Sequence, residues 1–107
     1  MESEKKELES DEQYTAKVIK AFTYEDGSII EFPAQLKKQL VIFRHCLAAF
    51  EPGKRYTEPE VNAILKRFHP DVAFLRRSFI VYGMMDREGG GGAYWRIDAA
   101  TEGNTPA

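Results

Sequence analysis

The sequence has a single cysteine, Cys46, so an internal disulfide is excluded. This low cysteine content is typical of a reducing compartment, and we expect a cytoplasmic protein. No run approaches the ~20 consecutive apolar residues that a membrane-spanning helix needs, so we expect no membrane partner. The first six residues lead into acidic side chains instead of an apolar stretch, and a secretory signal is therefore not expected.

Histidine is also scarce, with His45 and His69 as the only two. On a helix, the adjacent His45 and Cys46 side chains point about 100° apart, which is a poor geometry for sharing a metal ion. The neighbouring carboxylates Glu58 and Glu60 are explained by the start of a helix and need no acid–base role. We therefore expect no metal site, no cofactor and no enzymatic activity.

Charge is spread unevenly along the chain. Residues 1–32 hold four Lys against nine Asp or Glu, a net charge of −5, whereas residues 33–97 hold eleven Lys or Arg against six acids, a net charge of +5. Such a basic body can bind a polyanion, or it can be an ordinary solvated surface. We expect a disordered or loosely helical acidic segment over residues 1–13, a single domain over 14–98 and a frayed tail over 99–107.

The domain is expected to begin with a β-hairpin. Apolar and polar side chains alternate from Tyr14 to Tyr24, which favours a strand. Asp26-Gly27 is a strong turn signal, because Gly supplies the positive φ that a tight hairpin needs. Residues 29–32 are predicted to return as the second strand, which Pro33 ends.

Three helices are expected to follow. Pro33 and Pro52 bracket the first, over residues 34–50, and its large apolar residues recur three and four positions apart. Thr57 and Glu60 form a capping box that begins the second, over residues 57–68. Asp71 and Gly83 delimit the third, over residues 72–82. The predicted core stripe of the first helix comprises Leu36, Leu40, Phe43, Leu47 and Phe50.

The end of the domain is predicted to form a second hairpin around the glycines at 89–92. Its predicted strands are residues 84–87 and 93–97, and a short strand at 54–56 is expected to pair with them. A helix–turn–helix followed by such a wing is the plan of a winged helix, a scaffold that often holds one helix against DNA. The predicted fold class is therefore α+β: a small winged-helix-like domain with three helices, a C-terminal β-hairpin wing and an N-terminal β-hairpin.

The third helix carries the functional prediction. At 100° per residue, Val72, Leu75, Phe79 and Tyr82 share one arc, which we assign to the core. Arg77 points away from that arc and is a candidate for contact with a phosphate or a guanine, although a simple solvated charge is the alternative. Arg76 lies beside the arc and is expected to have a structural role, paired with an acid such as Asp86 or Glu60. The predicted DNA-binding residues are Lys66, Arg67, Arg77, Arg87 and Arg96.

Two apolar residues favour a different function. Phe74 and Val81 lie one i,i+7 step apart on the face that would enter the major groove, where a DNA reader usually presents polar side chains. They suit a protein surface, so the alternative is a module for homodimerisation or for binding another regulator. A third possibility is that Phe74 packs beneath the N-terminal hairpin.

The chain also resembles a bacterial family, domain of unknown function 2087, over residues 29–97. The runs that carry the resemblance are Phe32-Pro33-Ala34, Lys38-Gln39-Leu40, Phe50-Glu51-Pro52-Gly53-Lys54-Arg55-Tyr56-Thr57-Glu58, Glu60-Val61-Asn62, Ile64-Leu65-Lys66-Arg67-Phe68-His69-Pro70-Asp71, Leu75-Arg76-Arg77, Tyr82-Gly83, Asp86-Arg87-Glu88 and Tyr94-Trp95-Arg96. The resemblance implies a bacterial protein linked to transcription, because members occur alone or fused to winged-helix regulators of the metalloregulator type. It implies no particular site, since the family has no characterised one.

Overall fold

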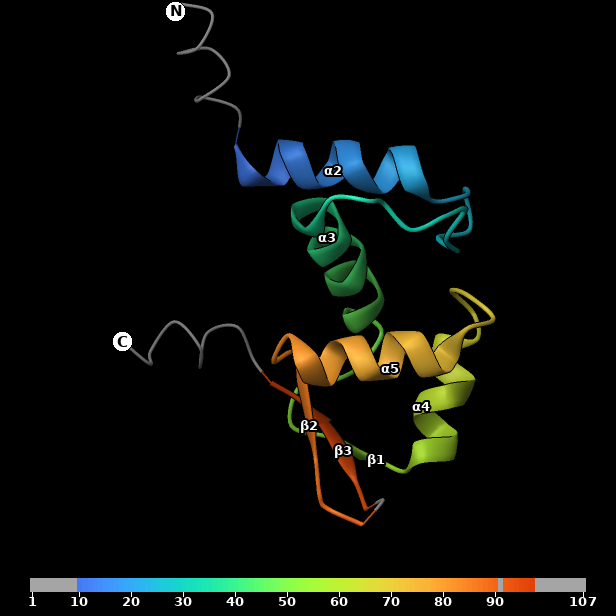
Figure 1. The fold of residues 1–107 in the computed structure, drawn as a ribbon, viewed down its shortest axis with the longest axis vertical. Helices are drawn as coiled ribbons and strands as arrows, with labels where there is room; N and C mark the ends of the chain where they lie inside the picture. Colours follow the sequence, from blue (N-terminus) through green and yellow to red (C-terminus); the bar gives the residue numbers. More distant parts are fainter. Residues whose placement is uncertain (1–9, 91, 98–107) are drawn as a thin grey trace, which may run out of the picture. The chain divides into compact units, whose positions relative to one another are not determined.

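The structure is a computed structural model that describes residues 10–90 and 92–97 (Figure 1). These residues form four helices and one three-stranded antiparallel sheet, so the predicted α+β class is confirmed. The chain divides into two compact units, Met1–Ile42 and Phe43–Ala107. The tail predicted at 99–107 and the first nine residues of the predicted acidic segment lie outside the described residues. The single domain over 14–98 stays a prediction.

The first unit contains α2, Asp11–Phe22, where the sequence predicted a strand, so the predicted N-terminal hairpin is wrong. A capping box begins the helix: the Ser10 hydroxyl accepts from the Gln13 amide, and the Gln13 side chain accepts from the Ser10 amide, both at 3.0 Å. Tyr14, Val18 and Phe22 recur four residues apart, and Val18 is buried. The helical period and the cap outweigh the apparent alternation, and residues 11–13 form the first turn of α2.

The turn that was predicted after Tyr24 is present, although the strands beside it are not. Gly27 has φ of 90°, and the Asp26 carboxylate accepts from the Ser28 hydroxyl at 2.6 Å and from the Ser28 amide at 2.9 Å. These hydrogen bonds, the hydroxyl one first, lower the pKa of Asp26. Strand pairing is limited to one antiparallel bridge between Thr23 and Ile29.

Helix α3, Leu36–Leu47, is the first helix predicted from the sequence and is shorter at both ends. The predicted core stripe holds only in part, because Leu36 at the start of α3 is 50% exposed while Phe43 and Phe50 are buried. Val41, Ile42 and Cys46, which the stripe omitted, are buried as well. The apolar face of this helix is therefore wider than one i,i+3/i+4 row.

The elements of the second unit follow the predicted order, and each is shorter than predicted at one or both ends. After the Phe43–Leu47 end of α3 come β1 (Arg55–Tyr56), α4 (Glu58–Leu65), α5 (Val72–Val81), β2 (Met85–Arg87) and β3 (Tyr94–Arg96). The strands pair antiparallel in the order β1-β3-β2, so the short strand before α4 does pair with the C-terminal hairpin. The Thr57–Glu60 capping box of α4 is present, and the Asp71 carboxylate accepts from the Phe74 amide at the start of α5.

The core of this unit lies where α5 packs against α4 and β2. Phe50 contacts Phe79 and Tyr56 edge-on, at ring-centroid distances of 6.0 and 5.1 Å. Edge-to-face aromatic contacts of this kind add to the energy of apolar burial. The other buried apolar residues of the unit are Phe43, Cys46, Leu47, Val61, Leu65, Leu75, Met84, Met85 and Tyr94.

Burial of Cys46 predicts a pH dependence of stability. Desolvation raises the pKa of its thiol from 9.0 to about 12, so the unfolded chain releases the proton at lower pH than the folded protein. The resulting stabilisation is complete below pH 9 and is lost as pH rises toward 12. The measurement is urea unfolding of wild type and Cys46→Ala from pH 8 to 10.5. The free energy of unfolding of the wild type, minus that of the variant, should fall by about 1.4 kcal/mol per pH unit above pH ~9. Parallel curves for the two proteins would contradict this account.

Candidate functional site

The outward face of α5 forms one wall of a pocket. Leu75, Ser78 and Phe79 on the inward face are buried in the core. The pocket-lining residues of α5 are Ala73, Arg76, Arg77, Ile80 and Val81. The first four follow the spacing of i, i+3, i+4 and i+7 that keeps side chains on one side of a helix. The core contacts of α5 thus direct its two arginines outward.

Strand β2 supplies a third arginine through its register with β3. Arg87 lies directly opposite Tyr94, and directly opposed residues of an antiparallel pair point to the same face of the sheet. Met85, two residues earlier on that same face, is buried, and β2 packs against α5. Arg87 therefore extends from the sheet toward α5 and lines the same pocket.

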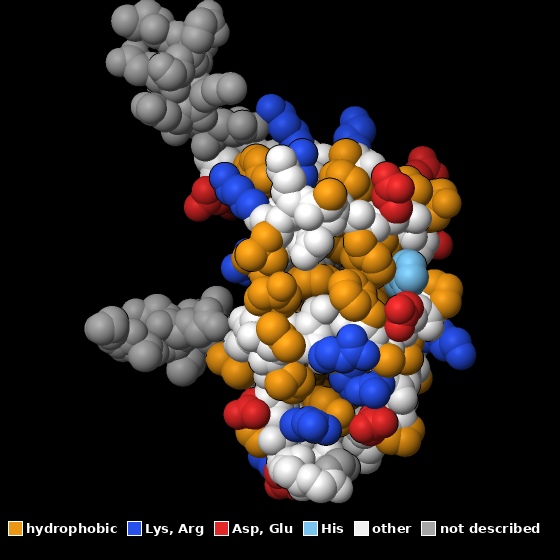
Figure 2. All heavy atoms as spheres, viewed as in Figure 1, with side chains coloured by type: hydrophobic (Ala, Val, Ile, Leu, Met, Phe, Trp, Pro, Cys, Tyr) orange, Lys and Arg blue, Asp and Glu red, His pale blue; other side chains and the backbone are white. Residues whose placement is uncertain are grey.

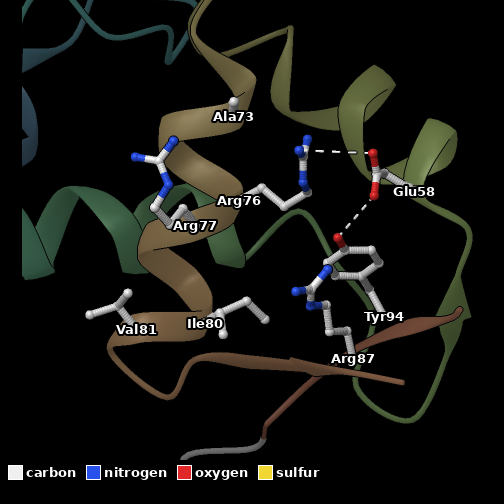
Figure 3. A pocket seen from close by; sticks show the side chains of 8 residues that line it. All are labelled: Glu58, Ala73, Arg76, Arg77, Ile80, Val81, Arg87 and Tyr94. Atoms are coloured by element: carbon white, nitrogen blue, oxygen red, sulfur yellow. Dashed lines mark hydrogen bonds and ion pairs between the residues drawn. The ribbon is translucent and has the colours of Figure 1, made fainter. Parts of the chain in front are cut away.

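The pocket is open to solvent and has a volume of about 240 Å³ (Figure 3). Its charged side chains are three arginines and one glutamate, so it carries a net charge of +2. A concave site with this excess of guanidinium groups is suited to binding an anion, because guanidinium donates paired hydrogen bonds to phosphate or carboxylate oxygens. Its lining residues are Glu58, Ala73, Arg76, Arg77, Ile80, Val81, Arg87 and Tyr94.

Arg76 is held by a hydrogen-bonded network at one side of the pocket. Its guanidinium donates to the Asn62 side-chain oxygen at 2.5 Å and lies 3.8 Å from the Glu58 carboxylate. The Tyr94 hydroxyl donates to the same carboxylate at 3.1 Å. The predicted structural role of Arg76 agrees with this geometry, but its acidic partner is Glu58, and the predicted pairing with Asp86 or Glu60 is wrong.

Arg77 and Arg87 differ from Arg76 because both are exposed and neither guanidinium has a hydrogen-bond or ion-pair partner among the described residues. In Figure 3, Arg76 extends toward Glu58, Arg77 extends away from it, and Arg87 rises from β2 toward the space beside Tyr94. Two of the five predicted DNA-binding residues therefore line one pocket, and neither has an ion-pair partner within residues 10–90 and 92–97.

The other three predicted DNA-binding residues lie elsewhere. Lys66 and Arg67 are exposed just after the end of α4 and do not line the pocket. Arg96 is partly buried, and its guanidinium donates to the Phe50 carbonyl at 2.8 Å. That hydrogen bond ties the end of β3 to the loop after α3, so Arg96 has a structural contact that the sequence did not reveal.

The turn end of the β2–β3 hairpin carries an exposed ion pair with β1. Arg55 donates to the Glu88 carboxylate at 2.6 Å, and its guanidinium lies 4.4 Å from the centre of the Trp95 ring. A side chain at Gly92 would overlap the Glu88 side chain, so this glycine is required by close approach. At the turn end of the hairpin, Glu88 therefore compensates the charge of Arg55.

The predicted apolar pair on α5 is divided between two environments. Phe74 is half-buried and lies edge-on to Phe43 of α3 at a ring-centroid distance of 5.9 Å. The N-terminal hairpin beneath which it could have packed is not formed, because residues 11–22 are helical. Val81 is 65% exposed and lines the pocket, and the adjacent Tyr82, predicted to be core, is 41% exposed. The Tyr82 ring stacks on the Phe43 ring, at a centroid distance of 5.9 Å.

Two pocket residues were missed by reasoning from the sequence. Glu58 was explained by helix capping alone, although its position at the first turn of α4 also brings it to Arg76. The Tyr94 ring is buried, and its hydroxyl reaches the Glu58 carboxylate, a contact that the sequence did not predict. The pairing of the Tyr94 strand with β2 was the available signal, since it places Tyr94 opposite Arg87.

Fold and pocket define the second unit as a small α+β module with an exposed arginine-lined site. Residues 28–96 match the family model described as "Uncharacterized protein conserved in bacteria (DUF2087)", and the chain belongs to this family. No curated protein and no solved structure matches the chain. In the part of the chain that the structure describes, no helix is long and apolar enough to cross a membrane.

Proposed function

We propose that the second unit is a winged-helix-like, non-catalytic module that binds double-stranded DNA in the cytoplasm and is associated with transcription. The order of elements supports the proposal: α4 and α5 are consecutive helices separated by residues 66–71, and β2 and β3 form a hairpin immediately after them. A sheet with the order β1-β3-β2 anchors that hairpin beside α5. In this arrangement α5 is the helix offered to the groove, and the hairpin is the wing.

The observation that carries the proposal is that Arg77 and Arg87 are both exposed and both line the pocket beside α5. One comes from the helix and the other from the wing, and neither guanidinium is compensated among the described residues. Phosphate contacts from two separate elements fix the position of a protein on a duplex. Lys66 and Arg67, exposed after α4, extend the basic surface, while Arg96 is omitted because its guanidinium already bonds to Phe50.

The charge of the unit supports the same surface. Residues 43–97 hold nine Lys or Arg against six Asp or Glu, a net charge of +3 in a chain whose total is −2. Figure 2 shows basic side chains gathered over α5 and the neighbouring hairpin. A polyanion is attracted by such a local excess of positive charge, whatever the sign of the whole chain.

Fluorescence anisotropy of a labelled random-sequence duplex tests the proposal. Arg77→Ala and Arg87→Ala should each weaken binding about tenfold, because each removes a charge-assisted hydrogen bond to phosphate. Arg44→Ala is the matched control, since Arg44 is an exposed arginine of α3 that does not line the pocket. Binding that weakens equally in all three variants would indicate non-specific attraction and contradict the proposal.

A second candidate function is homodimerisation or binding of another regulator through the end of α5. It is favoured by the exposure of Val81 and Tyr82, two large apolar side chains that are adjacent in sequence. An apolar interface predicts a dimer that persists at 1 M salt, where charge interactions are screened, and that Val81→Ser dissociates. Light scattering after size exclusion measures the mass, and a monomer at every concentration would exclude homodimerisation.

A further inference from the structure

The pocket beside α5 has two sides, which are separated by the helix. Ala73, Arg76 and Ile80 are spaced three and four residues apart, which places them in one row on the helix. Arg77 and Val81, four residues apart, form the neighbouring row. In Figure 3, Arg76 and Ile80 of the first row extend toward α4 and β2, and the second row extends to the opposite side of α5. The two rows are therefore separate surfaces for a small ligand.

The side that faces α4 and β2 is formed by a series of contacts from the sheet to both helices. Arg87 of β2 lies directly opposite Tyr94 of β3. The Tyr94 hydroxyl donates to the Glu58 carboxylate of α4 at 3.1 Å, and that carboxylate lies 3.8 Å from the guanidinium of Arg76 on α5. These contacts place Arg87 on the same side of α5 as Arg76, where Ile80 supplies an apolar wall (Figure 3).

Arg87 carries the guanidinium on this side that can pair with a ligand. Arg76 already donates to the Asn62 side-chain oxygen at 2.5 Å and lies beside Glu58. Arg87 is exposed, and its guanidinium has no hydrogen-bond or ion-pair partner within residues 10–90 and 92–97. Two arginines and one glutamate give this side a net charge of +1. One guanidinium matches one carboxylate, because it donates two parallel hydrogen bonds to the two carboxylate oxygens.

We propose that this side of the pocket binds a small carboxylic acid, with the carboxylate at Arg87 and the apolar group of the ligand against Ile80. The charge of the site favours a monoanion. A phosphate monoester is close to dianionic at pH 7.5, and its second charge would meet the Glu58 carboxylate instead of a second unpaired guanidinium. The volume of about 240 Å³ is below the ~300–1,000 Å³ typical of pockets for drug-sized ligands, so the ligand is small.

Nuclear magnetic resonance titration of the full-length protein tests the inference, with benzoate as the probe at pH 7.5 and ionic strength held constant with sodium chloride. We expect saturable shifts of the amides of β2 around Arg87 and of α5 around Ile80. Acetate lacks the ring, and benzamide lacks the charge, so both should bind several-fold more weakly. Phenyl phosphate should also bind more weakly than benzoate. Equal or tighter binding of benzamide or of phenyl phosphate would overturn the assignment of a carboxylate.

Arg87→Ala and Arg77→Ala form a matched pair, because they remove the same charge from the two sides of the pocket. Arg87→Ala should weaken benzoate binding about tenfold, whereas Arg77→Ala should change it less than about twofold. Arg87→Lys keeps the charge but loses the paired donors, so it should restore only part of the affinity. Equal losses in the two alanine variants would show that benzoate responds only to net charge, and would overturn the inference.

Glu58→Gln provides a variant with the opposite expected sign. Glutamine keeps an oxygen that accepts from Tyr94, but it removes the negative charge that opposes an incoming carboxylate. Benzoate should therefore bind a few-fold more tightly to this variant, a result that loss of structure does not produce. Weaker or unchanged binding would show that the carboxylate lies elsewhere and would overturn the inference.

The carboxylate site goes beyond DNA binding, and the two proposals can fail separately. Arg77→Ala distinguishes them, because it should weaken binding of the labelled duplex without weakening that of benzoate. Saturable benzoate binding that Arg87→Ala weakens, in a protein that does not bind the duplex, would keep the site and remove the proposed function. Duplex binding that depends on both arginines, combined with benzoate shifts that are scattered or do not saturate, would keep the proposed function and overturn the site.

Discussion

Phe79→Ala is expected to lower the free energy of unfolding by about 3–5 kcal/mol. The Phe79 side chain is fully buried, lies edge-on to Phe50, and comes from the face of α5 that packs against the core. Its removal takes away apolar burial and leaves a cavity that close-packed neighbours fill only in part. Because the total free energy of unfolding of a small domain is only about 5–15 kcal/mol, the variant should be partly unfolded at 37 °C.

Val81→Ala on the same helix is the matched control. Val81 is exposed and alanine is the better helix former, so urea unfolding should place this variant within about 0.5 kcal/mol of the wild type. Circular dichroism at increasing urea concentration measures both proteins. A loss below about 1 kcal/mol in Phe79→Ala would contradict the assignment of this face of α5 to the core.

The second large effect is expected in the salt dependence of DNA binding. Each phosphate neutralised by a guanidinium contributes about −0.9 to the slope of log affinity against log salt. Contacts by Arg77 and Arg87 alone predict a slope of about −1.8, or roughly a tenfold loss of affinity between 50 and 200 mM salt. The double variant Arg77→Ala, Arg87→Ala should have a slope less steep by about 1.8 and an affinity about a hundredfold lower at 50 mM salt.

The matched control for the salt experiment is Arg44→Ala, which changes the net charge of the chain without changing the α5–β2 surface. Its slope should equal that of the wild type. Equal slopes for the wild type and the double variant would mean that neither arginine contacts phosphate, and the proposed DNA surface would then be wrong.

The second unit could be predicted from sequence because its boundaries depend on local chemistry. The Thr57–Glu60 capping box and the Asp71 cap fix helix starts regardless of the rest of the chain. Gly83, at φ of 71°, ends α5 as predicted. The wing strands followed from the glycine-rich turn between them, and their pairing with β1 was also predicted.

Helix α2 was missed because two periods compete in the same residues. Every second side chain from Tyr14 to Tyr24 is apolar except Lys20, which resembles a strand, while Tyr14, Val18 and Phe22 form a helical row. The Ser10–Gln13 capping box decides between the two, since it satisfies backbone donors that only a helix leaves free. That box lies within residues 1–13, which were expected to be disordered or loosely helical, so the start of an ordered helix was not placed there.

The candidate site was predictable in part. The helical wheel separates Arg76 from Arg77, and their contrasting environments follow from it. The position of Arg87 beside α5 depends on how β2 packs against that helix, and the engagement of Arg96 by the Phe50 carbonyl depends on the position of a loop forty-six residues away. Such long-range contacts leave no signal in the spacing of residues along one element.

The most direct test of the central claim is to map duplex binding on the protein by nuclear magnetic resonance at 50 mM salt. The account predicts shifts concentrated in the amides of α5 around Arg77 and of β2 around Arg87, and losses of those shifts in the double variant. Shifts concentrated on the lysines of the first unit, such as Lys17 and Lys38, or the absence of any shift at saturating duplex, would contradict it.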